Sequence, residues 1–216
     1  NSVEISRPWD PLSSAQTRAI EARIGELVGL APSKHDSPLR IAVSLPWRAS
    51  NTLVQNLHHD THQRPRRVVT VVVYLSDAEH DELDGGSTTF PCLEAAAVSE
   101  ARVDQDGTSD TLGLCARLES GFQRGERFLG IPGGLHTGAS FDPVAAGGAS
   151  DCCLPLTERG VRIQPERGMA LILWSASPED GTPLARSWHG SCRVERGEKW
   201  TLQQFKELPP DDVPGE

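Results

Sequence analysis

Three histidines and one aspartate lie within five residues in the stretch HHDTH, residues 58–62, shortly before the β-branched run VVTVVVYL. Imidazole nitrogens and carboxylate oxygens are common ligands of transition metals. On a β-strand, residues i and i+2 point to the same side, so His58 and Asp60 would share one face. The stretch therefore predicts one edge of a metal site. We expect His59 and His62 to be solvated strand and turn residues that take no part in it.

A zinc-binding helix is the alternative interpretation of this stretch, because His58 and His62 are four residues apart. In zinc proteases that spacing comes with a glutamate directly after the first histidine, where it acts as general base. Here His59 occupies that position. Pro65 and the β-branched run that follows also oppose a helix, so the sequence favours the strand interpretation.

A catalytic metal needs a third ligand from elsewhere in the chain, and His189 in SWHGSC is the best candidate. Of the other histidines, His35 and His80 lie in polar, turn-like contexts and His136 lies in a glycine-rich stretch. Two histidines and one carboxylate on one face, with open coordination positions, are the ligand set of non-haem Fe(II) oxygenases.

Lys199, in the stretch RGEKW, adds a second element of such a site. A keto-acid cosubstrate that chelates iron through one end carries a second carboxylate, which needs a fixed cation in a buried site. Lys199 begins the strand after a turn and could supply that cation. The alternative is a lysine that only flanks a hairpin turn.

The composition excludes other classes of protein. The chain has 216 residues, enough for one sizeable domain, and a formal net charge of −9, which argues against nucleic-acid binding. No apolar run approaches the roughly 18 residues of a membrane span. Because the sequence begins with Asn1 rather than Met, we expect a processed or trimmed piece of a protein. The sequence does not define an oligomeric state.

The five cysteines leave the redox compartment open. No C-x-x-C pair occurs, so a thiolate zinc site is not expected. The odd count allows up to two disulfides with one free thiol, or five thiols. The cysteines are Cys92, Cys115, Cys152, Cys153 and Cys192.

The expected elements are one amphipathic helix followed by many short strands. The helix spans residues 13–30, and strands are expected in PLRIAVSL, in VVTVVVYL and on both sides of the turn in GVRIQPERGMALILW. SWHGSCRV and KWTLQQF are expected to form a hairpin. We predict a single domain over residues 1–208 with a loop-rich insertion at 92–159, and a flexible acidic tail at 209–216.

The order of the motifs resembles that of the 2-oxoglutarate- and Fe(II)-dependent prolyl 4-hydroxylase family. The matching stretches are HHDT, RVVTVVVYLSD, GGSTTFP, PERGMALILW, HGSCRV and GEKW, preceded by a similar helix and first strand. The resemblance covers most of the chain outside residues 92–159 and the tail. It implies a mainly β fold with flanking helices (α+β): a double-stranded β-helix (jelly-roll) barrel with an N-terminal helix and a long loop insertion.

Carried over residue by residue, the resemblance implies that His58, Asp60 and His189 are iron ligands. It also implies that Lys199 and Thr88 bind 2-oxoglutarate.

Arg67 matches an arginine that the family uses for peptide binding, and Phe205 stands where many members have a tryptophan near the peptide groove. A solvated charge at a strand end is the alternative for Arg67. Cys192 matches a cysteine that is often disulfide-bonded in secreted members, and the resemblance implies Cys152 or Cys153 as its partner. It therefore favours the secretory pathway or endoplasmic reticulum.

The sequence departs from the family pattern at several positions. Ser44 occupies the place of a tyrosine that contributes to 2-oxoglutarate binding, and Ser87 replaces the glutamate of G-G-E-T. The approach to the first histidine, LPWRASNTLVQNL, also differs from the usual one. These departures bear on the substrate and on cosubstrate affinity, and they leave the metal ligands intact.

The activity that the resemblance implies is hydroxylation of an unactivated C–H bond, in peptidyl proline, with release of succinate and CO2. Fe(II) would be the cofactor, 2-oxoglutarate and O2 the cosubstrates, and ascorbate a supporting reductant. The partner would be a proline-containing peptide or protein. Two alternatives are the same chemistry on a free amino acid or other small molecule, and a barrel that binds metal or peptide without turnover.

Overall fold

The computed structural model describes residues 2–4, 14–46, 54–90, 92–93, 135–136, 140–141 and 161–209. These segments contain mostly strands, with a few helices. In chain order the elements are β1 (Ser2–Glu4), α1 (Ala15–Val28), β2 (Arg40–Ser44), β3 (Val54–His58), α2 (Asp60–Gln63), β4 (Arg67–Tyr74), α3 (Ala78–Asp81), β5 (Asp84–Gly85), β6 (Thr88–Phe90), β7 (Leu135–His136), β8 (Ser140–Phe141), β9 (Val161–Ile163), β10 (Ala170–Trp174), the 3-10 turn η1 (Ala185–Ser187), β11 (His189–Cys192), β12 (Val194–Arg196) and β13 (Lys199–Glu207).

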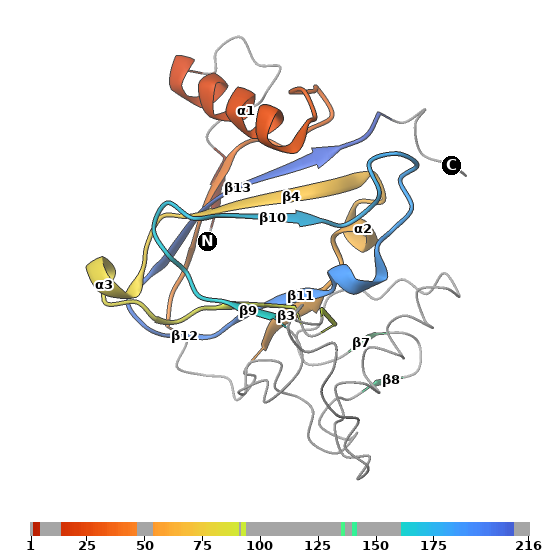
Figure 1. The fold of residues 1–216 in the computed structure, drawn as a ribbon. Helices are drawn as coiled ribbons and strands as arrows, with labels where there is room; N and C mark the ends of the chain where they lie inside the picture. Colours follow the sequence, from red (N-terminus) through yellow and green to blue (C-terminus); the bar gives the residue numbers. More distant parts are fainter. Residues whose placement is uncertain are drawn as a thin grey trace, which may run out of the picture.

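Two antiparallel sheets face each other (Figure 1). The larger sheet has the strand order β1-β2-β13-β4-β10 and the smaller one the order β3-β11-β6-β9. The chain passes back and forth between them, except that β6 and β9 follow each other in the smaller sheet: β2, β4, β10 and β13 belong to the larger sheet, and β3, β6, β9 and β11 to the smaller. This alternation is the topology of a double-stranded β-helix, so the predicted jelly-roll is confirmed.

Helix α1 covers the outer face of the larger sheet (Figure 1). Ser14 caps its N-terminus, since the side-chain oxygen accepts from the Thr17 N–H at 3.1 Å, and Gly29 ends it in the left-handed conformation at φ 69°. The apolar stripe of the helix packs on the sheet. The core cluster consists of Ile24, Val28, Leu39, Val68, Val69, Val71, Ala176 and Leu202.

The alternation of side chains along β4 and β13 gives the larger sheet two different faces. On β4, Val69 and Val71 belong to the core cluster, whereas the Tyr74 hydroxyl bonds to Thr88 of the smaller sheet. On β13, Leu202 belongs to the same core cluster, whereas Lys199 donates to a residue of β11. One face is therefore the hydrophobic core, and the other presents polar groups to the space between the sheets.

The predicted hairpin of SWHGSCRV and KWTLQQF is wrong. Strand β11 pairs with β3 and β6 in the smaller sheet, β12 pairs with β5, and β13 pairs with β2 and β4 in the larger sheet. Short strands of similar pattern do not reveal which sheet they join, and in a jelly-roll consecutive strands cross between sheets. The 92–159 insertion and the acidic tail lie almost wholly outside the described residues, so those predictions stand untested.

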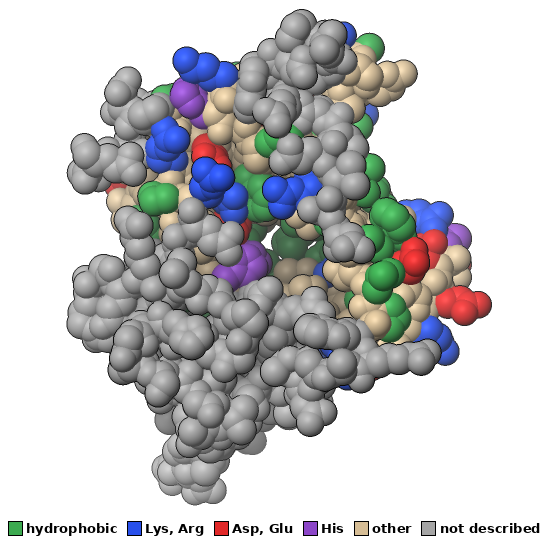
Figure 2. Space-filling model, turned by 180° about the vertical axis from the view of Figure 1, so that it is seen from behind, with side chains coloured by type: hydrophobic (Ala, Val, Ile, Leu, Met, Phe, Trp, Pro, Cys, Tyr) green, Lys and Arg blue, Asp and Glu red, His purple; other side chains and the backbone are tan. Residues whose placement is uncertain are grey.

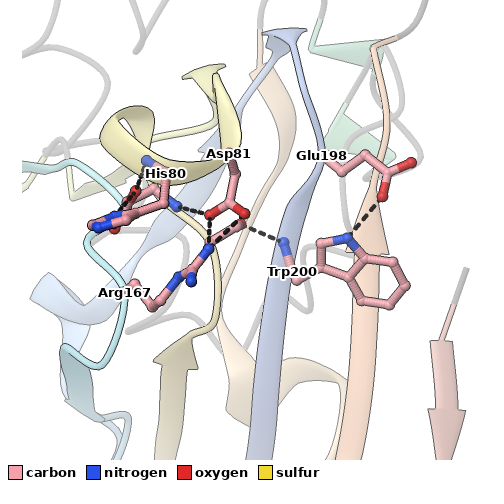
Figure 3. A network of polar contacts seen from close by, with 7 residues as sticks. His80, Asp81, Arg167, Glu198 and Trp200 are labelled. Atoms are coloured by element: carbon pink, nitrogen blue, oxygen red, sulfur yellow. Dashed lines mark hydrogen bonds and ion pairs between the residues drawn. The ribbon is translucent and has the colours of Figure 1, made fainter.

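A network of polar contacts holds the end of the larger sheet next to Lys199 (Figure 3). Arg167, in the turn before β10, donates to both carboxylate oxygens of Asp81 in α3 at 2.6 Å. The hydroxyl of Ser76 accepts from the Trp200 N–H at 2.8 Å, and the Trp200 indole donates to Glu198. The start of β13, where Lys199 lies, is thereby tied to the segment that follows β4.

A buried ion pair between Asp36 and Lys206 ties the loop after α1 to the end of β13. Lys206 is 1% exposed and also donates to the Ala31 carbonyl at 3.1 Å. Asp36 accepts from the Ser33 N–H at 2.9 Å. Sequence patterns gave no indication of this pair, because its partners lie at opposite ends of the chain. In the described part of the chain, no helix is long and apolar enough to cross a membrane.

We predict that Asp36→Asn destabilises the protein by about 3 kcal/mol, because it leaves the Lys206 ammonium buried without its counter-charge. Asp81→Asn, at the more exposed pair with Arg167, is the matched control and should cost much less, because water screens that pair. Urea unfolding of both variants measures the difference. Equal losses would show that the Asp36–Lys206 pair contributes no more than a surface ion pair.

Candidate metal centre

The structure brings together the three predicted metal ligands. His58 is the last residue of β3, Asp60 is the first residue of α2, and His189 is the first residue of β11. Their ligand atoms all lie within 4.8 Å of one another. Nε2 of His58 is 3.5 Å from Oδ1 of Asp60, and the two imidazole rings are 4.3 Å apart between centroids. The pairing of β3 with β11 sets His58 directly opposite His189.

The local backbone differs from the expected continuous strand. Strand β3 ends at His58, His59 is extended, and a single helical turn begins at Asp60. His58 and Asp60 therefore meet across a strand-to-helix junction. Because His58 lies in the strand, it does not share a helix with His62, and the zinc-helix interpretation does not apply.

The Asp60 carboxylate is 2% exposed and both of its oxygens are engaged. Oδ1 accepts from Arg67 Nη1 at 3.3 Å, and Oδ2 accepts from the Thr70 hydroxyl. Burial alone would raise the pKa of Asp60, but the hydrogen bond from His58 and the attraction of Arg67, and of His189 and His58 once acid protonates them, hold that pKa well below its usual range. The carboxylate is therefore ionised at neutral pH.

His189 is held in the tautomer that a metal requires. Its Nδ1 lies 2.9 Å from the Ser187 carbonyl, and because a carbonyl only accepts, Nδ1 carries the proton and Nε2 keeps its lone pair. The Phe90 ring stacks on the imidazole at 5.7 Å. Burial, followed by the neighbouring His58, lowers the pKa of His189 to about 4. An ionised carboxylate beside a neutral imidazole is the protonation state that a divalent metal binds.

A second polar cluster surrounds Lys199, which is 5% exposed. Its Nζ donates to the Ser191 hydroxyl at 3.0 Å and lies 5.5 Å from the centre of the Tyr74 ring. The Tyr74 and Thr88 hydroxyls are hydrogen-bonded at 2.7 Å. Burial lowers the pKa of Lys199 to about 8, so the ammonium form still predominates at neutral pH. A buried cation among hydroxyl groups is suited to bind a carboxylate.

Tyr74 is the residue of this cluster that sequence reasoning missed. Ser44 stands where the family has a tyrosine, and β2 does set Ser44 directly opposite Lys199. Tyr74 lies opposite Thr201 of β13, and its ring lies beside Lys199 from the other neighbouring strand. The signal was present, because Tyr74 shares strand parity with Thr70 and so points between the sheets.

Arg67 and Phe205 lie together at the other end of these strands. The Arg67 guanidinium stacks 3.7 Å from the Phe205 ring centre, and Arg40 lies 5.9 Å from the same ring. Arg67 is buried, so the alternative of a solvated strand-end charge is wrong. Figure 2 shows Lys and Arg side chains beside a hollow that has a histidine at its margin.

The structure also bears on His59 and on Cys192. His59 is 0% exposed, so its prediction as a solvated residue is wrong; the side chain of His62 lies outside the described residues. Cys192 is disulfide-bonded, and so is Cys92. The proposed partners of Cys192, residues 152 and 153, lie outside the described residues, and that pairing stays a prediction.

The ligand triad and the Lys199 cluster lie between the sheets of a double-stranded β-helix, an arrangement suited to a non-haem iron oxygenase. The chain belongs to the 2OG-Fe(II) oxygenase superfamily, which residues 53–206 match.

Similar proteins carry prolyl 4-hydroxylase names. Prolyl 4-hydroxylase 1 of Arabidopsis thaliana is 38% identical over 69 residues, which are 32% of this chain and 23% of that protein. Probable prolyl 4-hydroxylase 10 of the same plant is 24% identical over 147 residues, or 68% of this chain and 33% of that protein. The chain thus spans a third or less of the length of these two curated relatives.

Among solved structures, the viral collagen prolyl hydroxylase of Paramecium Bursaria Chlorella virus-1 is 15% identical. The match covers 95% of this chain and 74% of that chain, with a TM-score of 0.48. A structure of prolyl 4-hydroxylases from Phytophthora capsici is 13% identical, covering 99% of this chain and 49% of that chain, with a TM-score of 0.47.

The lowered pKa of His189 predicts how the metal-free protein responds to acid. The unfolded chain takes up a proton near pH 6.5 and the folded site only near pH 4. The unfolded state therefore binds more protons between these values, and stability is lost as the pH falls from 6.5 towards 4. In His189→Gln, melting temperatures across this range should fall less steeply than in the unaltered chain. Identical slopes would contradict the assignment of the effect to His189.

Proposed function

We propose that this protein is a 2-oxoglutarate- and Fe(II)-dependent dioxygenase that converts peptidyl proline to 4-hydroxyproline, releasing succinate and CO2. The observation that carries the proposal is the pairing of two clusters in one interior space. One is a two-histidine, one-carboxylate set, and the other is a buried lysine surrounded by hydroxyl groups.

One set of residues would bind the metal and another set would bind the cosubstrate. His58, Asp60 and His189 would hold Fe(II), while Lys199, with Tyr74 and Thr88, would hold the far carboxylate of 2-oxoglutarate. When bound, the iron and 2-oxoglutarate supply the oxidation by O2 that places a hydroxyl group on an unactivated C–H bond. Ascorbate would support turnover by keeping the iron reduced.

The protein's own contribution is to orient these groups and to keep water from them. Thr70 and Arg67 fix the Asp60 carboxylate from two sides, and the Ser187 carbonyl fixes the His189 ring. Ligands that are oriented in advance lose little free energy when the metal binds, and a constant ligand geometry favours one reaction over side reactions.

The substrate proposal is supported by the names of the similar proteins and by the half-buried Phe205 beside Arg67. An aromatic ring at the margin of the site is a suitable surface for the apolar pyrrolidine ring of proline in an extended, polyproline II-like peptide. The chain would thus act on a proline-containing peptide or protein. The disulfide-bonded cysteines support a location in the secretory pathway, where such bonds persist.

Lys199→Met should raise the KM for 2-oxoglutarate about 10- to 100-fold, since a charge-assisted hydrogen bond contributes about 1.5–3 kcal/mol. In the unaltered enzyme the same KM should rise above pH 8, where Lys199 loses its proton. The exposed Lys34, changed to Met, is the matched control and should leave KM unchanged. An unchanged KM for 2-oxoglutarate in Lys199→Met would show that Lys199 does not bind the cosubstrate.

The substrate is tested by incubating the enzyme with a proline-rich peptide, Fe(II), 2-oxoglutarate and ascorbate in air. Mass spectrometry should find one added oxygen on proline, and amino-acid analysis should identify 4-hydroxyproline. Phe205→Ala should raise the KM for the peptide about 10-fold without changing the KM for 2-oxoglutarate, whereas the exposed Leu27, changed to Ala, should alter neither. Succinate formation with an unmodified peptide would contradict the peptide substrate and favour a small molecule.

A further inference from the structure

His59, between the two proposed metal ligands in the sequence, is fully buried and uses both of its ring nitrogens. Nε2 lies 2.9 Å from the carbonyl oxygen of Leu184. Nδ1 lies 2.7 Å from the hydroxyl of Thr61 and 3.4 Å from its backbone N–H. The Trp188 indole packs edge-on against the ring, with centroids 5.8 Å apart and an interplanar angle of 66°. The imidazole is therefore held on every side by the protein itself.

These partners define which ring nitrogen of His59 carries the proton and which one accepts a hydrogen bond. A carbonyl oxygen only accepts, so Nε2 carries the proton and donates to Leu184. A backbone N–H only donates, so Nδ1 accepts from Thr61 and caps the N-terminus of α2. His59 has no lone pair left for a metal, and its role must differ from that of the adjacent His58.

The Leu184 carbonyl connects His59 to the third ligand. The same oxygen accepts from the Ser187 N–H at 2.9 Å and from the Ser187 hydroxyl at 2.5 Å, which closes the turn η1. The Ser187 carbonyl in turn accepts from Nδ1 of His189 at 2.9 Å. A continuous chain of hydrogen bonds thus leads from the junction of His58 and Asp60 to the ring of His189.

The sheet alone does not fix His189 in place. The pairing of β11 with β3 shifts register between His189 and Ser191, so the ladder is irregular beside the ligand. The segment before His189 is η1, whose N-terminus has no side-chain cap. The bond from His59 to Leu184 provides a fixed point where regular strand pairing is lost.

We infer that His59 is a positioning residue, which fixes the segment carrying His189 relative to the junction carrying His58 and Asp60. The inference rests on metal binding by these three residues, as proposed above. Outer partners of metal ligands commonly contribute 10- to 100-fold to metal affinity by holding ligands in their bound geometry. His59 would act over a longer path, through the backbone of residues 184–187.

The test uses Co(II) as the probe, because its visible absorption reports ligand geometry without turnover. His59→Asn keeps a side-chain acceptor for the α2 cap but is too short to reach Leu184. His59→Phe fills the space without either bond. Both variants should bind Co(II) about 10-fold or more weakly, with altered absorption. Thr61→Val, which retains the bond to Leu184, is the matched control and should keep the spectrum of the unaltered protein.

The melting temperature of each metal-free variant separates positioning from folding. A lowered melting temperature with unchanged Co(II) affinity and spectrum, in either folded His59 variant, would overturn the inference and leave His59 a structural residue. Thr61→Val matching the losses of His59→Asn would also overturn it, since a change that leaves the Leu184 bond in place would then be enough to cause them. Absence of Co(II) binding in the unaltered protein would instead contradict the metal site itself.

Discussion

The buried Asp60 carboxylate is the constraint on which the rest of the centre depends. An ionised carboxylate that is almost completely shielded from water needs compensation from its neighbours, and the fold supplies it from three directions: His58 from β3, and Thr70 and Arg67 from β4. Arg67 is itself buried and lies flat on Phe205 of β13. The negative charge of Asp60 thus constrains which side chains lie near it on β3, β4 and β13. A divalent cation would complete the neutralisation of that charge.

The jelly-roll makes this site possible because the two faces of the larger sheet have different roles. Outward residues of β4 and β13 such as Val69, Val71 and Leu202 belong to the hydrophobic core beneath α1, while inward residues such as Tyr74 and Lys199 carry the polar groups of the site. Inward positions of β4 reach the metal centre at Thr70 and the lysine cluster at Tyr74. Two polar clusters, reached by β4 positions four residues apart, are therefore built on backbone that packs against the core, which suits a ligand with a chelating end and a carboxylate end.

The sequence was sufficient for the features that depend on local pattern. The β-branched run predicted β4, the amphipathic pattern of residues 13–30 predicted α1, and motif order pointed to the three clustered ligand residues and to Lys199. It was insufficient where partners lie far apart in the chain. The Asp36–Lys206 pair, the contact of Tyr74 with Thr88 and the burial of His59 beneath Trp188 all depend on how strands cross between sheets. The wrong hairpin of β11 with β13 has the same cause, since alternation does not tell which sheet a strand joins.

In the proposed function, the three metal ligands and the Lys199 cluster act on the same cosubstrate molecule, 2-oxoglutarate. The most direct measurement is succinate formed from 2-oxoglutarate in air, with Fe(II) and ascorbate, by the unaltered chain and by Asp60→Asn. We expect succinate from the unaltered chain and none above background from the variant, which keeps the size of the side chain but loses its charge. Equal succinate from both proteins, or none from an unaltered chain shown to hold iron, would contradict it.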